Sequence, residues 1–142
     1  MKVPTSLFLV LVLVGAFFQS DPAYAAKPVN FVVQLTRSST DHGQRIAFLQ
    51  MRKILHEFGP DRVHFTVVAY EKGITALLAK NKETNQLLIS LADEGVKFEA
   101  CRISMKAYGY KESDFPLEVD FVPAGAPEMI RLQMKGYKYW KP

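Results

Sequence analysis

Short runs of β-branched and aromatic residues alternate along the chain with stretches whose apolar residues recur at helical spacing. The runs favour β-strands and the spaced stretches favour helices. Five strands are predicted, over 30–35, 63–69, 96–100, 119–122 and 137–140. Strands that alternate with helices indicate an α/β fold, in which helices cover both faces of a mostly parallel five-stranded sheet to give a three-layer single domain.

The helices between these strands are predicted from apolar spacing and from end signals. Asp41 caps the first helix, which Gly59 and Pro60 terminate, and Pro127 is predicted as the first residue of the last helix. The predicted helical segments are 41–58, 74–79, 84–94, 102–108, a short helix or turn at 112–117, and a last helix from 127.

The N-terminus has the three parts of a secretory signal peptide. Lys2 gives a positive start, residues 7–18 carry no polar side chain, and Ala23-Tyr24-Ala25 is a small-x-small cleavage site. The apolar run is shorter than the roughly 20 residues of a permanent membrane helix. We expect cleavage after Ala25 and export to a bacterial periplasm as one domain over 26–142; an uncleaved membrane anchor is the alternative.

The charge of the chain gives little support for a nucleic-acid partner. The formal charge is +4, and it stays +4 after cleavage because the predicted leader holds one Lys and one Asp. The basic residues are spread along the chain except at 135–141, where lysines and aromatic residues alternate. Such a tail is able to bind nucleic acid, but alternation at a chain end favours a final strand, and no nucleic-acid partner is expected.

Cys101 is the only cysteine, and it stands where a predicted buried strand ends and a predicted helix begins. A single cysteine forms no disulfide within the chain, so the thiol is buried, paired with another chain, or chemically used. The amide groups and dipole at a helix start favour thiolate over thiol. A small, inert, buried residue is the other interpretation.

Ligands of an open parallel sheet bind outside the carboxyl ends of its strands. The polar residues predicted at that edge suit a small anion or a polar sulfur compound, and a nearby Arg37, Lys72 or Arg102 would lower the thiol pKa. Solvated loop charges are the alternative for Lys72 and Arg102. The binding candidates beside Cys101 are Thr36, Arg37, Ser39, His42, Tyr70, Lys72, Arg102 and Ser104.

Other site chemistries have weaker support. The glycine pattern for dinucleotides is missing after the first strand, so no cofactor is expected. His42, His56 and His64 lack metal-ligand spacing, and no metal site is expected. Only His42 shares the predicted edge with Cys101, which leaves open a Cys-His pair for acyl transfer without an identified orienting group.

Several motifs resemble one known family. G-V-x-F-x-A-C ends at Cys101, L-x-x-x-G precedes it and ends at Gly95, V-P-x-G spans 122–125, and Q-x-x-G-Y spans 133–137. With the strand at 63–69, these motifs resemble the DsrE/DsrF-like (YchN-like) family over 29–142. The resemblance implies a three-layer fold with a parallel five-stranded sheet, assembly as trimers or hexamers, and sulfur carried as a persulfide on the cysteine that ends the third strand.

Two segments depart from the pattern that the resemblance implies. Arg102-Ile103-Ser104 follows the cysteine, where sulfur-relay members have small residues and arginines. Tyr70-Glu71-Lys72-Gly73 stands where many relatives carry a histidine and glycines. Export also separates this chain from cytoplasmic sulfur transfer, so the resemblance carries the fold further than the function.

The leading hypothesis is a periplasmic protein that carries sulfane sulfur as a persulfide on Cys101, as a carrier more than as a turnover enzyme. A homo-oligomer, most simply a trimer or hexamer, and a thiol-containing donor or acceptor protein are its expected partners, with no membrane anchor after cleavage. The alternatives are a non-catalytic oligomeric module that binds a small anion or ligand, with an inert buried Cys101, and a structural assembly subunit. The exposure and the pKa of Cys101 distinguish the first hypothesis from the others.

Overall fold

The computed structural model describes residues 27–37 and 43–142. The predicted signal peptide, the Asp41 cap, Ser39 and His42 lie outside these residues. The elements, in chain order, are β1 (Val29–Leu35), α1 (Gly43–Phe58), β2 (Val63–Ala69), the 3-10 segment η2 (Glu71–Leu77), α2 (Asn85–Asp93), β3 (Lys97–Cys101), α3 (Arg102–Tyr108), the 3-10 segment η3 (Glu112–Asp114), β4 (Val119–Val122), α4 (Gly125–Met134) and β5 (Lys138–Trp140).

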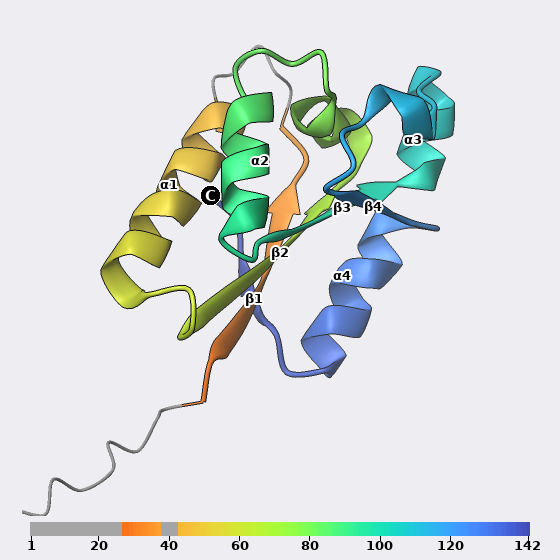
Figure 1. Ribbon diagram of the computed structural model, residues 1–142. Helices are drawn as coiled ribbons and strands as arrows, with labels where there is room; N and C mark the ends of the chain where they lie inside the picture. The colour runs from red at the N-terminus through yellow and green to blue at the C-terminus, as the bar shows by residue number, and fades with distance from the viewer. Residues whose placement is uncertain (1–26, 38–42) are drawn as a thin grey trace, which may run out of the picture.

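The five strands form one sheet in the order β4-β3-β2-β1-β5, and every pairing is parallel (Figure 1). Leu35 pairs with Ala69 and Cys101 pairs with Val122, so the carboxyl ends of four strands meet at one edge. The predicted five-stranded α/β sheet is confirmed, and it is parallel throughout. Parallel strands place the segments that follow them at that same edge, which is where the predicted site lies.

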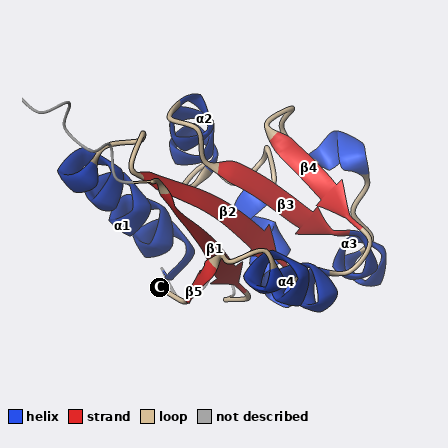
Figure 2. Ribbon diagram, turned by 90° about the horizontal axis from the view of Figure 1, so that it is seen from below, coloured by secondary structure: helices blue, strands red, loops and turns tan. Residues whose placement is uncertain are grey.

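Alternating side chains divide the sheet into two buried faces. Val33, Val67 and Phe98 point to the larger core, which α1 and α2 cover together with η2. Val32 and Val68 point the other way and pack against Met129 and Leu132 of α4. Figure 1 shows α1 and α2 to the left of the sheet and α4 to its right, which is the three-layer arrangement, and Figure 2 shows the strands from below. Two-sided burial agrees with the consecutive apolar pairs Val32-Val33 of β1 and Val67-Val68 of β2.

Several predicted boundaries differ from the structure by one or more residues. The last helix begins at Gly125, so Pro127 is its third residue and the prediction that it is the first was wrong. Proline is tolerated there because the first backbone N–H groups of a helix have no partner within the helix. The helical piece predicted over 74–79 is the 3-10 segment Glu71–Leu77, and β3 begins at Lys97 instead of Val96.

Among the described residues, none of the helices has the length and apolar character needed to cross a membrane.

Candidate functional site

Cys101 is the last residue of β3 and the N-cap of α3, as predicted. Alternation along β3 turns its side chain to the face that α4 covers, because Ala100 belongs to the core on the opposite face. The residue is only 4 % exposed. The thiol therefore lies in a closed space between the end of β3 and the start of α4.

The sulfur accepts a hydrogen bond from the backbone amide of Gly125, with an N···Sγ distance of 3.2 Å. Gly125 is the first residue of α4, so this amide is one of the donors that the helix itself leaves unpaired. The helix dipole places partial positive charge at the same point. The Cys101 sulfur thus accepts the hydrogen bond of a backbone amide at the start of α4, 24 residues further along the chain.

These donors decide the ionisation of the thiol. Burial by itself raises the pKa of Cys101, but hydrogen bonding from the Ser104 side chain and from the amides of Ser104, Gly125 and Ile103 outweighs burial. The net pKa is lowered from the ordinary value of a cysteine. A cysteine buried among apolar groups alone shows the opposite shift.

Ser104 connects the sulfur to the segment after β2. Its side chain is buried, at 7 % exposure, and its Oγ accepts a hydrogen bond from the backbone amide of Glu71 at 2.7 Å. Glu71 has a φ of +49°, which places a non-glycine residue in the left-handed region. That conformation costs about 1 kcal/mol or more and persists only where the surroundings impose it. The contact with Ser104 is one such constraint.

Tyr70 holds the start of α4 in place. A Cβ at Gly125 would lie 2.7 to 2.8 Å from Tyr70 side-chain atoms, so α4 approaches the ring more closely than any other residue would allow. The Tyr70 hydroxyl accepts a hydrogen bond from the Gln34 amide, and the Tyr139 hydroxyl donates to Gln34 Oε1 at 2.5 Å. This chain of contacts links β2, β1 and β5 beside the sulfur-binding amide.

The predicted cations Arg37, Lys72 and Arg102 are exposed side chains, and no hydrogen bond joins them to the Cys101 sulfur. The exposed Arg102 pairs with Glu112, and its guanidinium lies 5.3 Å from the centre of the Phe121 ring. Lys72 is exposed, and its carbonyl accepts a hydrogen bond from Thr75 Oγ1 at 2.8 Å. Arg37 is exposed, and its carbonyl accepts from Gln44 Nε2 at 2.6 Å. Hydrogen bonds from backbone and hydroxyl donors, and no cation, are the causes that lower the thiol pKa.

The remaining predicted residues contribute less to this geometry. Thr36 is half-buried directly after β1. Ser39 and His42 lie outside the described residues, so the Cys-His pair stays a prediction. In the two described ranges, no three His, Cys, Asp or Glu side chains gather closely enough to bind a metal.

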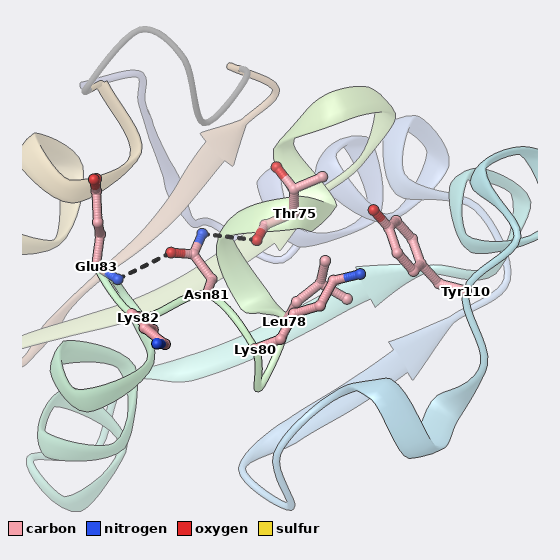
Figure 3. A pocket seen from close by; sticks show the side chains of 7 residues that line it. All are labelled: Thr75, Leu78, Lys80, Asn81, Lys82, Glu83 and Tyr110. Atoms are coloured by element: carbon pink, nitrogen blue, oxygen red, sulfur yellow. Dashed lines mark hydrogen bonds between the residues drawn. The ribbon is translucent and has the colours of Figure 1, made fainter.

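Two large hollows of the surface lie elsewhere. One, of about 490 Å³, lies between the segment that joins η2 to α2 and Tyr110 (Figure 3). Two of its polar side chains have partners: Asn81 donates to the Thr75 carbonyl at 2.9 Å and accepts from the Glu83 amide at 3.1 Å, and Lys80 lies over the Tyr110 ring. The other, of about 460 Å³, is lined by His64, Lys97 and their neighbours at the opposite end of the strands. Neither is lined by Cys101.

Sequence reasoning missed two features of the site. The V-P-x-G motif marked Gly125, but nothing in the sequence showed that its amide meets the sulfur. The strained Glu71 amide was also not predicted, because no glycine or asparagine marks that position. Both features depend on contacts between segments that are distant in the sequence.

Three solved structures share this fold. The first is a protein of unknown function, MTH1491, from Methanobacterium thermoautotrophicum, at 24% identity and a TM-score of 0.70, and the match covers 81% of this chain and 98% of that one. The second is the YchN protein from E. coli, at 12% identity and a TM-score of 0.67, and the match covers 80% of this chain and 99% of that one. The third is a conserved protein of unknown function, BT1422, from Bacteroides thetaiotaomicron, at 13% identity and a TM-score of 0.61, and the match covers 84% of this chain and 99% of that one. At these identities the likeness shows the fold alone.

The sequence itself gives the family. No curated protein matches the chain significantly. The model of the DsrE/DsrF-like family matches residues 30–142, which include every described strand from Asn30 onward and the site cysteine. The chain therefore belongs to the DsrE/DsrF-like family.

Proposed function

We propose that this protein carries sulfane sulfur as a persulfide on Cys101. The observation that carries the proposal is the set of donors around the sulfur, led by the Gly125 amide at 3.2 Å, which lowers the thiol pKa despite burial. The thiolate is the form of cysteine that attacks sulfur. Membership of the DsrE/DsrF-like family supports a role related to sulfur relay in outline.

The transfer is a displacement at sulfur without net oxidation. The Cys101 thiolate attacks the outer sulfur of a persulfide donor, R–S–SH, and a bond forms between Sγ and that sulfur. The bond between the two donor sulfurs breaks, and its electron pair leaves on the donor as R–S⁻. Cys101 then carries –S–SH, and the reverse step on an acceptor thiolate releases Cys101 as the thiolate. The donor amides stabilise the anion at each stage.

The test is the intact mass of the protein after incubation with inorganic polysulfide. Additions in steps of one sulfur atom are expected, and a reductant should remove them. Because Cys101 is the only cysteine, Cys101→Ser should abolish every addition while the fold is retained. Additions that survive this substitution, or a wild-type protein that gains no sulfur, would contradict the proposal.

The second candidate is a non-catalytic module in which Cys101 is inert, and the 4 % exposure of the residue favours it. On this alternative, iodoacetamide reacts with Cys101 only after unfolding. Reaction of the native protein near neutral pH excludes the alternative, and reaction limited to the unfolded protein excludes the carrier.

We further propose that the carrier acts in the periplasm as a homo-oligomer. The leader-like residues 1–25 support export, and exposed apolar side chains such as Met134 and Ile103 support assembly. N-terminal sequencing of a periplasmic extract should find Ala26 first, and light scattering should give a trimer or hexamer mass. Met1 in a membrane fraction, or a monomer at micromolar concentration, would contradict these two proposals respectively.

A further inference from the structure

We propose that copies of this chain assemble head to tail, with Leu117 beside β4 of one copy packed into an apolar groove between α4 and β5 of the next copy. This inference rests on the homo-oligomer of the proposed function, and it names the two surfaces that meet. β4 and β5 are the two edge strands of the sheet, so these surfaces lie at opposite edges of one molecule (Figure 2). A chain therefore cannot fill its own groove with its own Leu117.

The α4–β5 groove has a volume of about 210 Å³, and its lining includes Ala126, Met129 and Ile130 of α4 and Tyr139 of β5. The three α4 residues share one face of the helix, because residues three and four apart are neighbours. Ile130 and Tyr139 are at least half exposed, so the groove is open to solvent. Its volume is below the roughly 300–1,000 Å³ of small-molecule pockets, and it suits one apolar side chain better than a free ligand.

Each polar side chain that borders the groove has a hydrogen bond within the chain. The Gln34 amide donates to the Tyr70 hydroxyl and accepts from the Tyr139 hydroxyl. Gln133 Nε2 donates to the Met129 carbonyl at 3.0 Å. A polar ligand would have to compete with these bonds, whereas an aliphatic side chain leaves them intact. The groove therefore fits an apolar occupant.

Leu117 is the occupant that the chain itself offers. It lies in the turn before β4, and it is the most exposed large apolar side chain of the described residues. Burial of apolar surface is the main favourable contribution to protein association, so a second copy that covers this leucine gains stability from it. A single exposed leucine is ordinary on a protein surface. The charges around Leu117 and around the groove distinguish this one.

The two edges of the sheet carry opposite charge. Residues 112–120 around Leu117 hold four acidic residues and no basic residue, and residues 135–142 around β5 hold three lysines and no acidic residue. Of these four acids, only Glu112 has an ion-pair partner in the described chain, which is Arg102. Contact between two β4 edges would bring acids together and contact between two β5 edges would bring lysines together, so only unlike edges attract.

A contact between unlike edges has a consequence for symmetry. Every copy offers one Leu117 and one groove, so the contact is heterologous, and we expect it to close into a ring of at least three copies. Charge on an edge strand ordinarily prevents pairing with another molecule. Here the charges oppose pairing of like edges and leave the pairing of β4 with β5 favourable.

The α4–β5 groove adjoins the sulfur site. Ala126 follows Gly125, whose amide donates to the Cys101 sulfur. Tyr70, which limits the space at Gly125, also lines the groove. The assembly therefore places a contact between subunits next to each Cys101.

The test is light scattering of two variants that each remove one half of the contact. Leu117→Asp removes the apolar side chain and leaves the groove, whereas Ile130→Asp places a charge in the groove and leaves Leu117. Both positions are exposed, so each variant should keep its fold by circular dichroism and should be a monomer. The matched control is Phe58→Asp, because Phe58 is as exposed as Ile130, at 58 %, but ends α1. This control and the wild type should both give the mass of a trimer or larger ring.

An equimolar mixture of the two variants gives the more specific signature. The Leu117→Asp protein has an intact groove and the Ile130→Asp protein has an intact Leu117, so one contact should form and yield a one-to-one heterodimer. A contact between two Leu117 side chains, or between two grooves, would instead leave one of the variants assembled by itself. If an aspartate variant does not fold, Leu117→Ser and Ile130→Ser take the same places in the design.

Four results would overturn the proposal: a monomeric wild type, the wild-type mass in either groove-contact variant, a mixture that stays monomeric, or loss of assembly in Phe58→Asp. Failure of the carrier function is distinguishable, because intact mass measures sulfur addition on monomers and rings alike. Normal sulfur loading of a Leu117→Asp protein that keeps the wild-type assembly rejects this inference alone. The expected masses in a protein that gains no sulfur reject the carrier and retain the contact.

Discussion

Gly125→Ala is the substitution that most directly tests how the fold prepares the thiol. The added Cβ would lie 2.7 Å from Tyr70 Cβ and 2.8 Å from Cγ and Cδ1, and ordinary contacts begin at 3.4 Å. Tyr70 yields little, because its Cβ is fixed to the backbone after β2 and its hydroxyl is bound by Gln34. The start of α4 must therefore retreat by roughly 0.7 Å. That retreat lengthens the 3.2 Å contact between the Gly125 amide and the Cys101 sulfur.

The expected change in stability follows from two opposing effects. Overpacking of a close contact costs about 1–3 kcal/mol of unfolding free energy. Alanine in a helix offsets up to about 1 kcal/mol of that cost relative to glycine. We expect a net loss of about 1–2 kcal/mol, which lowers Tm by roughly 4–8 °C in a domain of this size. Circular dichroism on heating measures this change, and the thiolate absorbance should show a higher thiol pKa in the same variant.

Gly43→Ala is the matched control, since Gly43 is the first residue of α1. There the added Cβ meets Arg37 Cδ at 2.7 Å and Nη1 at 3.0 Å, which belong to a flexible exposed side chain. This variant should keep the wild-type thiol pKa and should lose little or no stability. A Gly125→Ala protein with the wild-type Tm and thiol pKa would show that α4 is not held against the sulfur as described.

Three further substitutions test other parts of the structure. Gly73→Ala should lower the unfolding free energy by more than Gly125→Ala, because its Cβ would lie 1.9 Å from the Leu35 carbonyl oxygen and backbone cannot turn aside; chemical denaturation measures the difference. Glu99→Gln should stabilise the protein by up to about 1 kcal/mol at pH 7, because burial first and Asp120 second raise the pKa of Glu99 and a partly exposed carboxylate is screened by water. Because the pKa of Glu99 is raised in the folded protein, the wild type loses stability as the pH rises through that pKa. The stability that Glu99→Gln gains at pH 7 should therefore vanish in acid, where Glu99 is protonated. An equal gain at low pH would contradict the assignment of the effect to Glu99 ionisation. Arg102→Ala should shift the thiol titration less than Gly125→Ala, because the exposed Arg102 is already paired with Glu112.

The sheet was predictable from the sequence because its strands are short apolar runs with helical stretches between them. The bounds of β2 and β4 agree with the prediction residue for residue, and Cys101 lies at the predicted junction. Burial on both faces leaves a strong local signal of this kind. The start of α4 has a weaker signal: Pro127 is acceptable anywhere in the first turn, so proline by itself does not fix the first residue.

The location of the candidate site at the carboxyl edge of the sheet was predictable from the sequence, but the contacts to the Cys101 sulfur were not. Parallel topology places Cys101, Ser104 and the residues after β2 at one edge, and this follows from element order alone. The sequence does not show which of these groups meets the sulfur. It suggested Ser104 and the cations Arg37, Lys72 and Arg102, whereas the structure places the Gly125 amide on the sulfur and pairs Arg102 with Glu112. Contacts of this kind depend on tertiary distances of a few tenths of an ångström.

Burial and ionisation affect the reactivity of Cys101 in opposite directions: burial reduces access to the sulfur, and the lowered pKa increases the fraction of thiolate. The 4 % exposure restricts which molecules reach the sulfur, whereas the donors that lower its pKa determine how much of the sulfur is thiolate once a molecule arrives. A buried cysteine among apolar groups has low access and a raised pKa together. Here low access is combined with a lowered pKa, so the exposure of Cys101 favours the inert interpretation and its pKa favours the reactive one.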